Sequence, residues 1–201
     1  MCGKRKSRRA VLIVVGVLLA ILAFTGIWTA YALATRPDYS PPDTAGWRTG
    51  DIFFSVGDTW ESVAVRSLTG IKGLPVADST PSHCGIVVHT PEGLRLVHES
   101  TVAGRIVAET PEDYLHNNGS RCIYARHIPC PVDTSMLKVH IDSLLHLAVP
   151  FDFTFNHNDP RELYCTELVV RLLEMNGTDA FSDLRTNNYI YPQDLAKRCI
   201  P

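Results

Sequence analysis

The fold is decided by the stretch LYCTELVVRLLEMNG, residues 163–177. Apolar residues recur in it at spacings of three and four, which predicts one helix with an apolar face: Leu168, Val169, Leu172 and Leu173. Asn176-Gly177 predicts the end of this helix, because glycine adopts the left-handed conformation without a steric cost.

Cys165 lies in the first turn of the expected helix and, three residues before Leu168, on its apolar side. The amide groups and dipole of a helix N-terminus stabilise a thiolate and lower the pKa of a thiol placed there. Cys165 is therefore a candidate nucleophile. The alternative is a small residue that fills a gap in the core, since free cysteine is among the most buried residue types.

A charge-free apolar run covers residues 10–34 and follows a basic segment at residues 1–9. About 20 apolar residues span a bilayer, so the run predicts a transmembrane anchor. Basic flanking segments stay in the cytoplasm, which places the rest of the chain on the extracytoplasmic (periplasmic) side of the cell membrane. The alternative is a signal sequence cleaved after Ala32-Leu33-Ala34. Residues 35–46 then form a proline-containing linker, and residues 47–201 one domain.

The charges and cysteines of the domain bear on its partners. Five of the 19 basic residues precede the apolar run, whereas all 21 acidic residues follow it. The domain is therefore acidic, which argues against nucleic-acid binding. Five of the 6 cysteines also follow the run. In an oxidising compartment one free thiol and two disulfides are a consistent arrangement, with the pairing left open. No cysteine or histidine spacing is typical of a zinc site, so no metal or other cofactor is expected.

Runs of β-branched and aromatic residues alternate with amphipathic segments along the domain. Strands are expected over 52–54, 81–89, 94–101, 105–107 and 122–128, and helices over 59–69, 110–115, 133–149 and 163–177. One face of the 133–149 helix carries Leu137, Ile141, Leu144 and Ala148. Strands grouped between helices, with hairpin connections, indicate an α+β domain in which a mainly antiparallel sheet packs against helices.

A cysteine nucleophile needs a base, and the base needs a group that orients it. His83 is the best placed of the 8 histidines, because it begins the strand over 81–89. Gly85 is on the same face and leaves room for a helix to pack close. Cys84 is then expected to face away from His83.

The orienting group depends on the hairpin that follows the His83 strand. Pro91-Glu92-Gly93 suits a three-residue loop that ends in a left-handed glycine. This register makes Glu99 the diagonal neighbour of His83, where a carboxylate would fix the imidazole tautomer. A two- or four-residue loop would instead put His98 and Ser100 on the face of His83.

The order of several motifs resembles that of the YiiX/YebB-type permuted papain-like amidases, which are relatives of the NlpC-type cysteine peptidases. The motifs are Gly-Asp-Ile-Phe-Phe (50–54), Ser-His-Cys-Gly-Ile-Val (82–87), His-Glu-Ser (98–100), Phe-Asp-Phe-Thr-Phe (151–155), Tyr-Cys-Thr-Glu-Leu-Val (164–169) and Tyr-Pro-Gln-Asp-Leu (191–195). The resemblance covers about residues 47–197 and is most specific in the second and fifth motifs. It departs from the family at Cys84, where an aliphatic residue is expected.

The resemblance implies a papain-like fold in which the catalytic histidine precedes the cysteine. It implies Cys165 as nucleophile, His83 as general base and then acid, and Glu99 as the third member of the triad. It also suggests Tyr164 and Asp152 as substrate-pocket residues. An acyl-enzyme would form on Cys165, with the backbone N–H of that residue as an oxyanion donor.

These observations favour a membrane-anchored, extracytoplasmic cysteine hydrolase that cleaves amide bonds. Its substrate would be a cell-wall peptide, a small amide or a lipid-linked molecule. The alternatives are a lipid acyltransferase or thioesterase on the same fold, since a related permuted branch handles acyl chains, and a non-catalytic binding module. The presence of Cys165, His83 and Glu99 together argues against the binding module.

Overall fold

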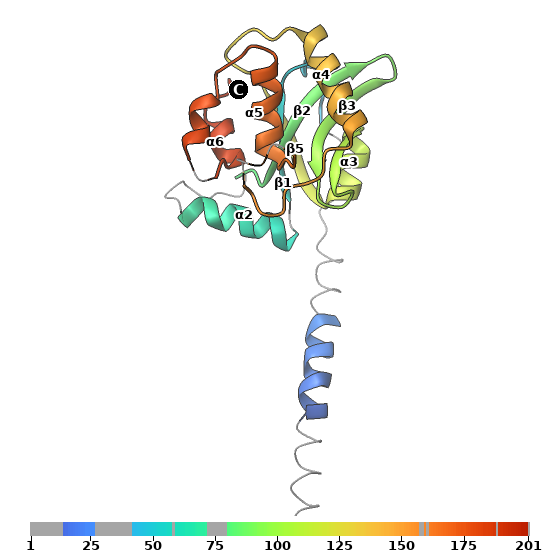
Figure 1. Cartoon of the computed structure of the whole chain (residues 1–201). Helices are drawn as coiled ribbons and strands as arrows, with labels where there is room; N and C mark the ends of the chain where they lie inside the picture. Colours follow the sequence, from blue (N-terminus) through green and yellow to red (C-terminus); the bar gives the residue numbers. More distant parts are fainter. Residues whose placement is uncertain are drawn as a thin grey trace, which may run out of the picture. The chain divides into compact units, whose positions relative to one another are not determined.

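The computed structural model describes residues 14–26, 42–57, 59–71, 80–156, 159, 161–187 and 189–200 (Figure 1). The chain divides into two compact units, Met1–Asp38 and Tyr39–Pro201. Residues 14–26 of the first unit form an exposed helix. Among all described residues, no helix has the length and apolarity needed to cross a bilayer. The anchor expected over 10–34 therefore has no structural support, and its residues 10–13 and 27–34 lie outside the described residues, as do the basic tail and part of the linker.

A five-stranded sheet forms the centre of the second unit, in the order β4-β3-β2-β1-β5, and every neighbouring pair is antiparallel. The strands are β1 (Ile52–Gly57), β2 (His83–Thr90), β3 (Gly93–Ser100), β4 (Arg105–Glu109) and β5 (Ser120–Arg126). All residues of β1 are buried, because helices cover both faces of the sheet at this strand. The α+β class and the antiparallel sheet expected from the sequence are thus confirmed.

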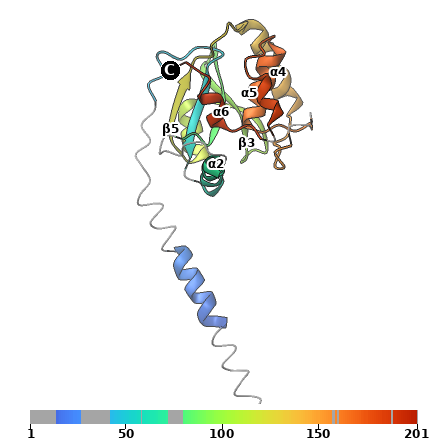
Figure 2. The ribbon, with the colours of Figure 1, turned by 90° about the vertical axis from the view of Figure 1, so that its left-hand side faces the viewer.

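The helices cover the sheet from two sides. They are α2 (Trp60–Ile71), α3 (Pro111–Asn118), α4 (Thr134–Leu147), α5 (Cys165–Met175) and α6 (Pro192–Ala196), with a 3₁₀ helix, η1, at Ser182–Thr186. Helix α5 packs on β2 and β3, and it lies between α4 and α6 in both views (Figures 1 and 2). Helix α3 packs on β3, β4 and β5 from the opposite face.

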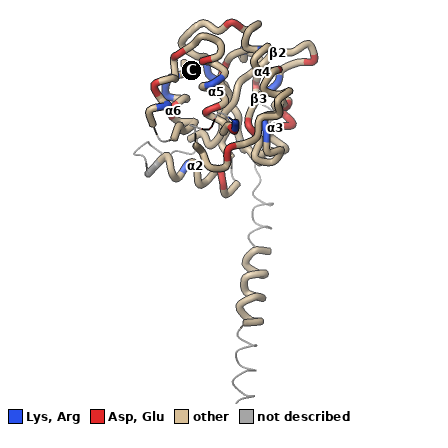
Figure 3. The backbone as a smooth tube through the Cα atoms, viewed as in Figure 1, with Lys and Arg blue, Asp and Glu red and all other residues tan. Residues whose placement is uncertain are grey.

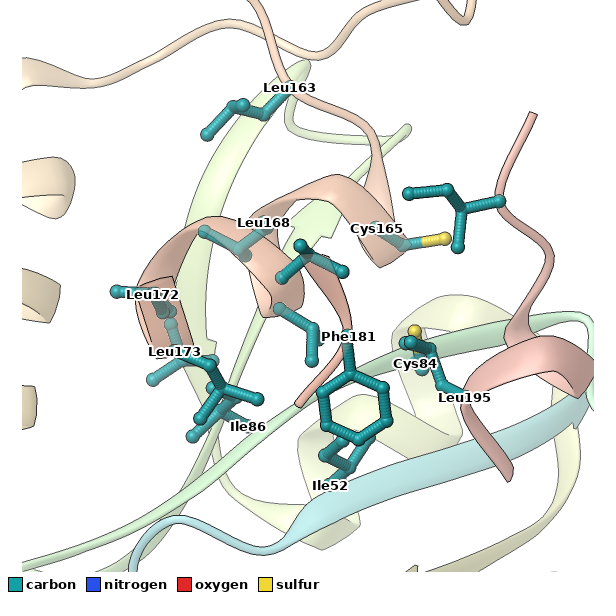
Figure 4. Close-up of a cluster of buried hydrophobic side chains, with 14 of the residues drawn as sticks. Ile52, Cys84, Ile86, Leu163, Cys165, Leu168, Leu172, Leu173, Phe181 and Leu195 are labelled. Atoms are coloured by element: carbon teal, nitrogen blue, oxygen red, sulfur yellow. The ribbon is translucent and has the colours of Figure 1, made fainter. Parts of the chain in front are cut away.

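Two hydrophobic cores follow from the alternation of side chains along the strands. Phe54 and Ile86 belong to the larger core, which they share with residues of α5. Figure 4 shows Ile86 of this core together with Leu168 of α5. Phe53 is on the other face of β1 and belongs to the smaller core, where it meets Tyr114 of α3. Residues that are neighbours in a strand therefore serve different sides of the sheet.

Helix α5 is buried more completely than one apolar face requires. Among its residues from Cys165 to Leu173, all but Arg171 are buried, including Thr166 and Glu167. The expected end is confirmed, since the helix stops at Met175 and Gly177 has a φ of 79°. The helix is enclosed because the sheet, α4 and α6 all contact it.

Helix α4 confirms most of the expected pattern. Asp133 caps it by accepting hydrogen bonds from the backbone N–H groups of Ser135 and Met136, at 2.9 and 3.0 Å. Leu137, Ile141 and Leu144 are buried as predicted. The prediction for Ala148 is wrong: it ends the helix in the left-handed conformation, with a φ of 49°, and is exposed.

Two remaining features of this unit are its disulfide state and the distribution of its charged residues. The expected pair of disulfides is not formed among the described cysteines, which are Cys84, Cys122, Cys130, Cys165 and Cys199. Acidic and basic positions are interspersed along the described part of the unit (Figure 3).

Candidate active site

Cys165 begins α5, and the residue before it, Tyr164, is extended, with a φ of −107° and a ψ of 169°. The chain therefore enters the helix directly at the cysteine, whose side chain is 8% exposed. The first N–H groups of a helix have no partner within the helix, so they face the sulfur with partial positive charge. Figure 4 shows Cys165 in this first turn, near Cys84 of β2.

His83 is the first residue of β2, and its side chain forms a hydrogen bond with that of Cys165. The pKa of the Cys165 thiol is held well below its usual range by hydrogen bonding from Cys84 and by the positive charge of His83, although burial opposes this. The low pKa favours the thiolate form of Cys165, which is the reactive state of a nucleophilic cysteine, beside the imidazole of His83. The structure brings together these two residues as the sequence predicted.

The predicted hairpin register is wrong. Thr90 pairs with Gly93, so Pro91 and Glu92 form a two-residue loop instead of the three-residue loop that was expected. Gly93 has a φ of 116° but is the first residue of β3, and its carbonyl oxygen accepts a hydrogen bond of 3.0 Å from the Thr90 hydroxyl. Because side chains alternate along a strand, this shift of one residue moves Glu99 to the other face.

His98 takes the position that was predicted for Glu99. Its Nδ1 lies 3.1 Å from Nε2 of His83, and its Nε2 lies 2.9 Å from Oε2 of Glu109. The pairing of His98 with Val107 across β3 and β4 places Glu109 diagonally beside it on the same face. The side chains thus form a chain from Cys165 through His83 and His98 to Glu109.

The protonation states of these hydrogen-bonded side chains follow from the ionisation of Glu109. The hydrogen bond from His98 lowers the pKa of Glu109 to about 2, with further help from Asn117 and Asn118, so the carboxylate is ionised and only accepts. Burial lowers the pKa of His98, which is fully buried, and keeps it neutral. His98 therefore donates from Nε2 and accepts at Nδ1, and the N–H at Nε2 of His83 donates to it. This leaves Nδ1 of His83 as the nitrogen that can exchange a proton with Cys165.

Aromatic packing holds the two imidazoles. Their rings are nearly perpendicular, at 88°, with centroids 5.1 Å apart. Tyr114 of α3 stacks on His83 at 6.2 Å and meets the edge of His98 at 4.8 Å, and its hydroxyl lies 2.6 Å from that of Ser55. Gly85 leaves space for this arrangement, not for a helix as predicted, because a Cβ there would lie 2.9 Å from that of His98.

Glu99 lies on the other side of the sheet and is fully buried. Neither of its carboxyl oxygens has a hydrogen-bond partner among the described residues. Burial raises its pKa to about 9, and the negative charges of Cys165 and Glu167 add to this effect. The predicted role of Glu99 as the group that orients His83 is therefore wrong, because its neutral carboxyl group lies on the other face of the sheet from the His83 side chain.

Tyr164 and Asp152 are both buried beside the nucleophile-bearing segment. The Tyr164 hydroxyl accepts a hydrogen bond of 3.3 Å from the backbone N–H of Ile190. Asp152 accepts hydrogen bonds of 2.7 Å from both the N–H and the hydroxyl of Thr154. These contacts anchor the surrounding loops, and the role of the two residues in binding substrate stays a prediction.

Sequence reasoning missed three residues of the site: His98, Glu109 and Cys84. The signal for His98 was present in the alternative register of the hairpin. Cys84 does face away from His83 as expected, yet this turns it toward Cys165, because α5 packs on that face of β2. No group of three or more metal-ligating side chains occurs within the described ranges.

The comparisons with known proteins identify a fold. No protein-family model matches the sequence, and no curated protein does. Among solved structures, the chain is similar to the metalloprotein YiiX of Escherichia coli O157:H7, a member of DUF1105. The TM-score is 0.55 at 15% sequence identity, and the match covers 75% of this chain and 92% of that one. The chain therefore shares its fold distantly with a YiiX-type protein.

Proposed function

We propose that this protein is a cysteine hydrolase that cleaves amide bonds through an acyl-enzyme on Cys165, as in permuted papain-like amidases. The observation that carries the proposal is the continuous chain of contacts from Cys165 through His83 and His98 to Glu109. Burying a polar group is costly, so the buried imidazole of His98, hydrogen-bonded to the Glu109 carboxylate, has no packing advantage over an apolar side chain. Orientation of His83 explains it.

In the proposed mechanism the Cys165 thiolate attacks the carbonyl carbon of the substrate. The backbone N–H of Cys165 at the start of α5 stabilises the developing oxyanion. The C–N bond breaks as the His83 imidazolium gives its proton to the leaving nitrogen. Water then attacks the thioester and gives a proton to His83, the C–S bond breaks, and the carboxylic acid and the free thiolate result.

The N-terminal apolar run favours a substrate at the outer face of a membrane. The apolar run over residues 10–34 is the reason to propose an anchored, extracytoplasmic enzyme. The acidic composition of the rest of the chain favours peptides, small amides or lipid-linked molecules over nucleic acids.

A second candidate, hydrolysis or transfer of lipid acyl groups, is favoured by one specific observation. Phe153 and Phe155 are 66% and 39% exposed, and the ring of Phe155 lies 5.5 Å from that of Tyr164, next to the nucleophile. Exposed aromatic side chains beside a nucleophile suit the binding of an acyl chain. Hydrolysis of acyl esters or thioesters without hydrolysis of peptides or amides would select this candidate.

The proposal is tested by alkylation at pH 6, where an ordinary thiol with a pKa of about 8.5 is almost entirely protonated. The full chain is treated with an iodoacetamide probe, and the modified cysteine is identified by peptide mass mapping. Labelling is expected at Cys165, to disappear in Cys165→Ala and to fall in both His83→Ala and His98→Gln. Cys122→Ala, which removes an exposed thiol, is the matched control and should leave labelling unchanged.

The same variants are then assayed against a panel of peptides, amides and acyl esters. Cleavage that requires Cys165 and His83 supports the proposal. Labelling that is unchanged in Cys165→Ala, or cleavage that survives this substitution, would refute it. Glu99→Gln should affect cleavage less than His98→Gln, because only His98 contacts His83.

A further inference from the structure

Cys84 is a second thiol beside the nucleophile. It is fully buried inside the core that α5 shares with β2, and Cys165 belongs to the same core (Figure 4). Its side chain forms a hydrogen bond with that of Cys165, and its backbone N–H also donates to the Cys165 sulfur. One residue of β2 therefore provides two donors to the same sulfur atom.

The two sulfurs have different surroundings, which decides which one carries the charge. Cys165 is at a helix N-terminus and next to the positive charge of His83. Cys84 is in the middle of the apolar core, where burial raises the pKa of its thiol well above the usual range. Cys84 therefore keeps its proton, and its S–H group is the donor to the Cys165 thiolate.

We propose that Cys84 is a positioning residue, whose S–H and N–H groups hold the Cys165 thiolate in its reactive state. The inference rests on the proposed function, since it assigns Cys84 a part in activating that nucleophile. It explains why a polarisable donor occupies a core position of β2 that faces the first turn of α5. It also assigns the two neighbours His83 and Cys84 complementary tasks, proton exchange and charge stabilisation.

The test compares substitutions that separate hydrogen bonding from packing. Cys84→Val keeps the buried volume and removes the S–H donor, whereas Cys84→Ser keeps a donor in its O–H group. The pH dependence of Cys165 alkylation by iodoacetamide is measured for the full chain, with the modified residue identified by mass mapping. Cys199→Val, which replaces another buried thiol of the same core, is the matched control.

We expect Cys84→Val to raise the apparent pKa of Cys165 by about one unit, which makes alkylation on the acid side of the profile about tenfold slower. Cys84→Ser and Cys199→Val should retain the wild-type profile. A folded Cys84→Val protein with the wild-type profile would overturn the inference, and so would equal losses in the Val and Ser variants, which indicate packing alone.

Hydrolysis assays of the same variants distinguish failure of this inference from failure of the proposed function. A depressed pKa of Cys165 that depends on Cys84, in a protein that hydrolyses no amide or ester, supports the inference about Cys84 and refutes the proposed function. A wild-type Cys165 that titrates like an ordinary thiol overturns the inference directly. Circular dichroism of each variant confirms that the comparison is made between folded proteins.

Discussion

Glu109 anchors the end of the proposed proton-exchange chain, and its loss has a calculable effect. Its carboxylate accepts hydrogen bonds from Nε2 of His98 at 2.9 Å and from the side-chain amides of Asn117 and Asn118 at 2.7 and 3.0 Å. The side chain is only 19% exposed. These contacts lower its pKa from 4.5 to about 2, with the bond from His98 as the largest cause.

A lowering of this size is worth about 3 kcal/mol of folding free energy, since each pKa unit corresponds to about 1.4 kcal/mol. The folded pKa is below the unfolded one, so this stability is fully present above about pH 4.5. It is lost as the pH falls toward 2, where the folded carboxylate is protonated. At pH 3 roughly half of it should remain.

The assay is denaturant unfolding of the full chain and of Glu109→Gln, at pH 7 and at pH 3. Glutamine keeps the shape and one acceptor oxygen but removes the charge. The variant should be less stable by about 3 kcal/mol at pH 7 and by about half of that at pH 3. Glu112→Gln, an exposed position on α3, controls for the general loss of one negative charge. An equal deficit at both pH values would refute the ionised hydrogen-bond network.

Two further predictions concern the scaffold of the site. Gly85→Ala should destabilise the protein by about 2 kcal/mol or more in the same unfolding assay, because a Cβ would lie 2.3 Å from the Val97 carbonyl oxygen and 2.5 Å from the Phe53 ring. Gly46→Ala, whose Cβ would meet no atom within 4 Å, is its control, and equal stabilities of the two variants would contradict the packing argument. Asp133→Ala should cost about 1 kcal/mol through loss of the α4 cap, whereas Asp133→Asn should cost little; a stable Ala variant would show that the cap is dispensable.

The sequence predicted best what depends on short-range pattern. The periodicities of residues 133–149 and 163–177 are each a property of one segment, and both helices form within a few residues of the expected bounds. The helix expected over 110–115 also forms, and Thr110 caps it by accepting a hydrogen bond from the N–H of Asp113. The prediction that Ala148 lies on the apolar face was wrong, because the position of a helix end depends on backbone conformation and the presence of an apolar residue does not predict it.

The orienting residue failed for a different reason. Whether Gly93 closes a three-residue loop or begins β3 is decided by a single backbone conformation, and this choice exchanges Glu99 and His98 on the face of His83. The role of Glu109 could not be predicted for a third reason. Its contact with His98 depends on the register between β3 and β4, which no local sequence pattern determines.

The arrangement of His83 and Cys84 has a consequence for how the site can vary. Consecutive residues of a strand point to opposite faces, so one dipeptide reaches the Cys165 sulfur from both sides of the sheet. The two groups are joined by a single peptide bond, so their separation cannot drift through movement of separate elements. The reactivity of Cys165 then depends on the distance between the start of β2 and the first turn of α5. Packing of the core around α5 sets that distance, so substitutions in the hydrophobic core can change the reactivity of Cys165 without altering a catalytic side chain.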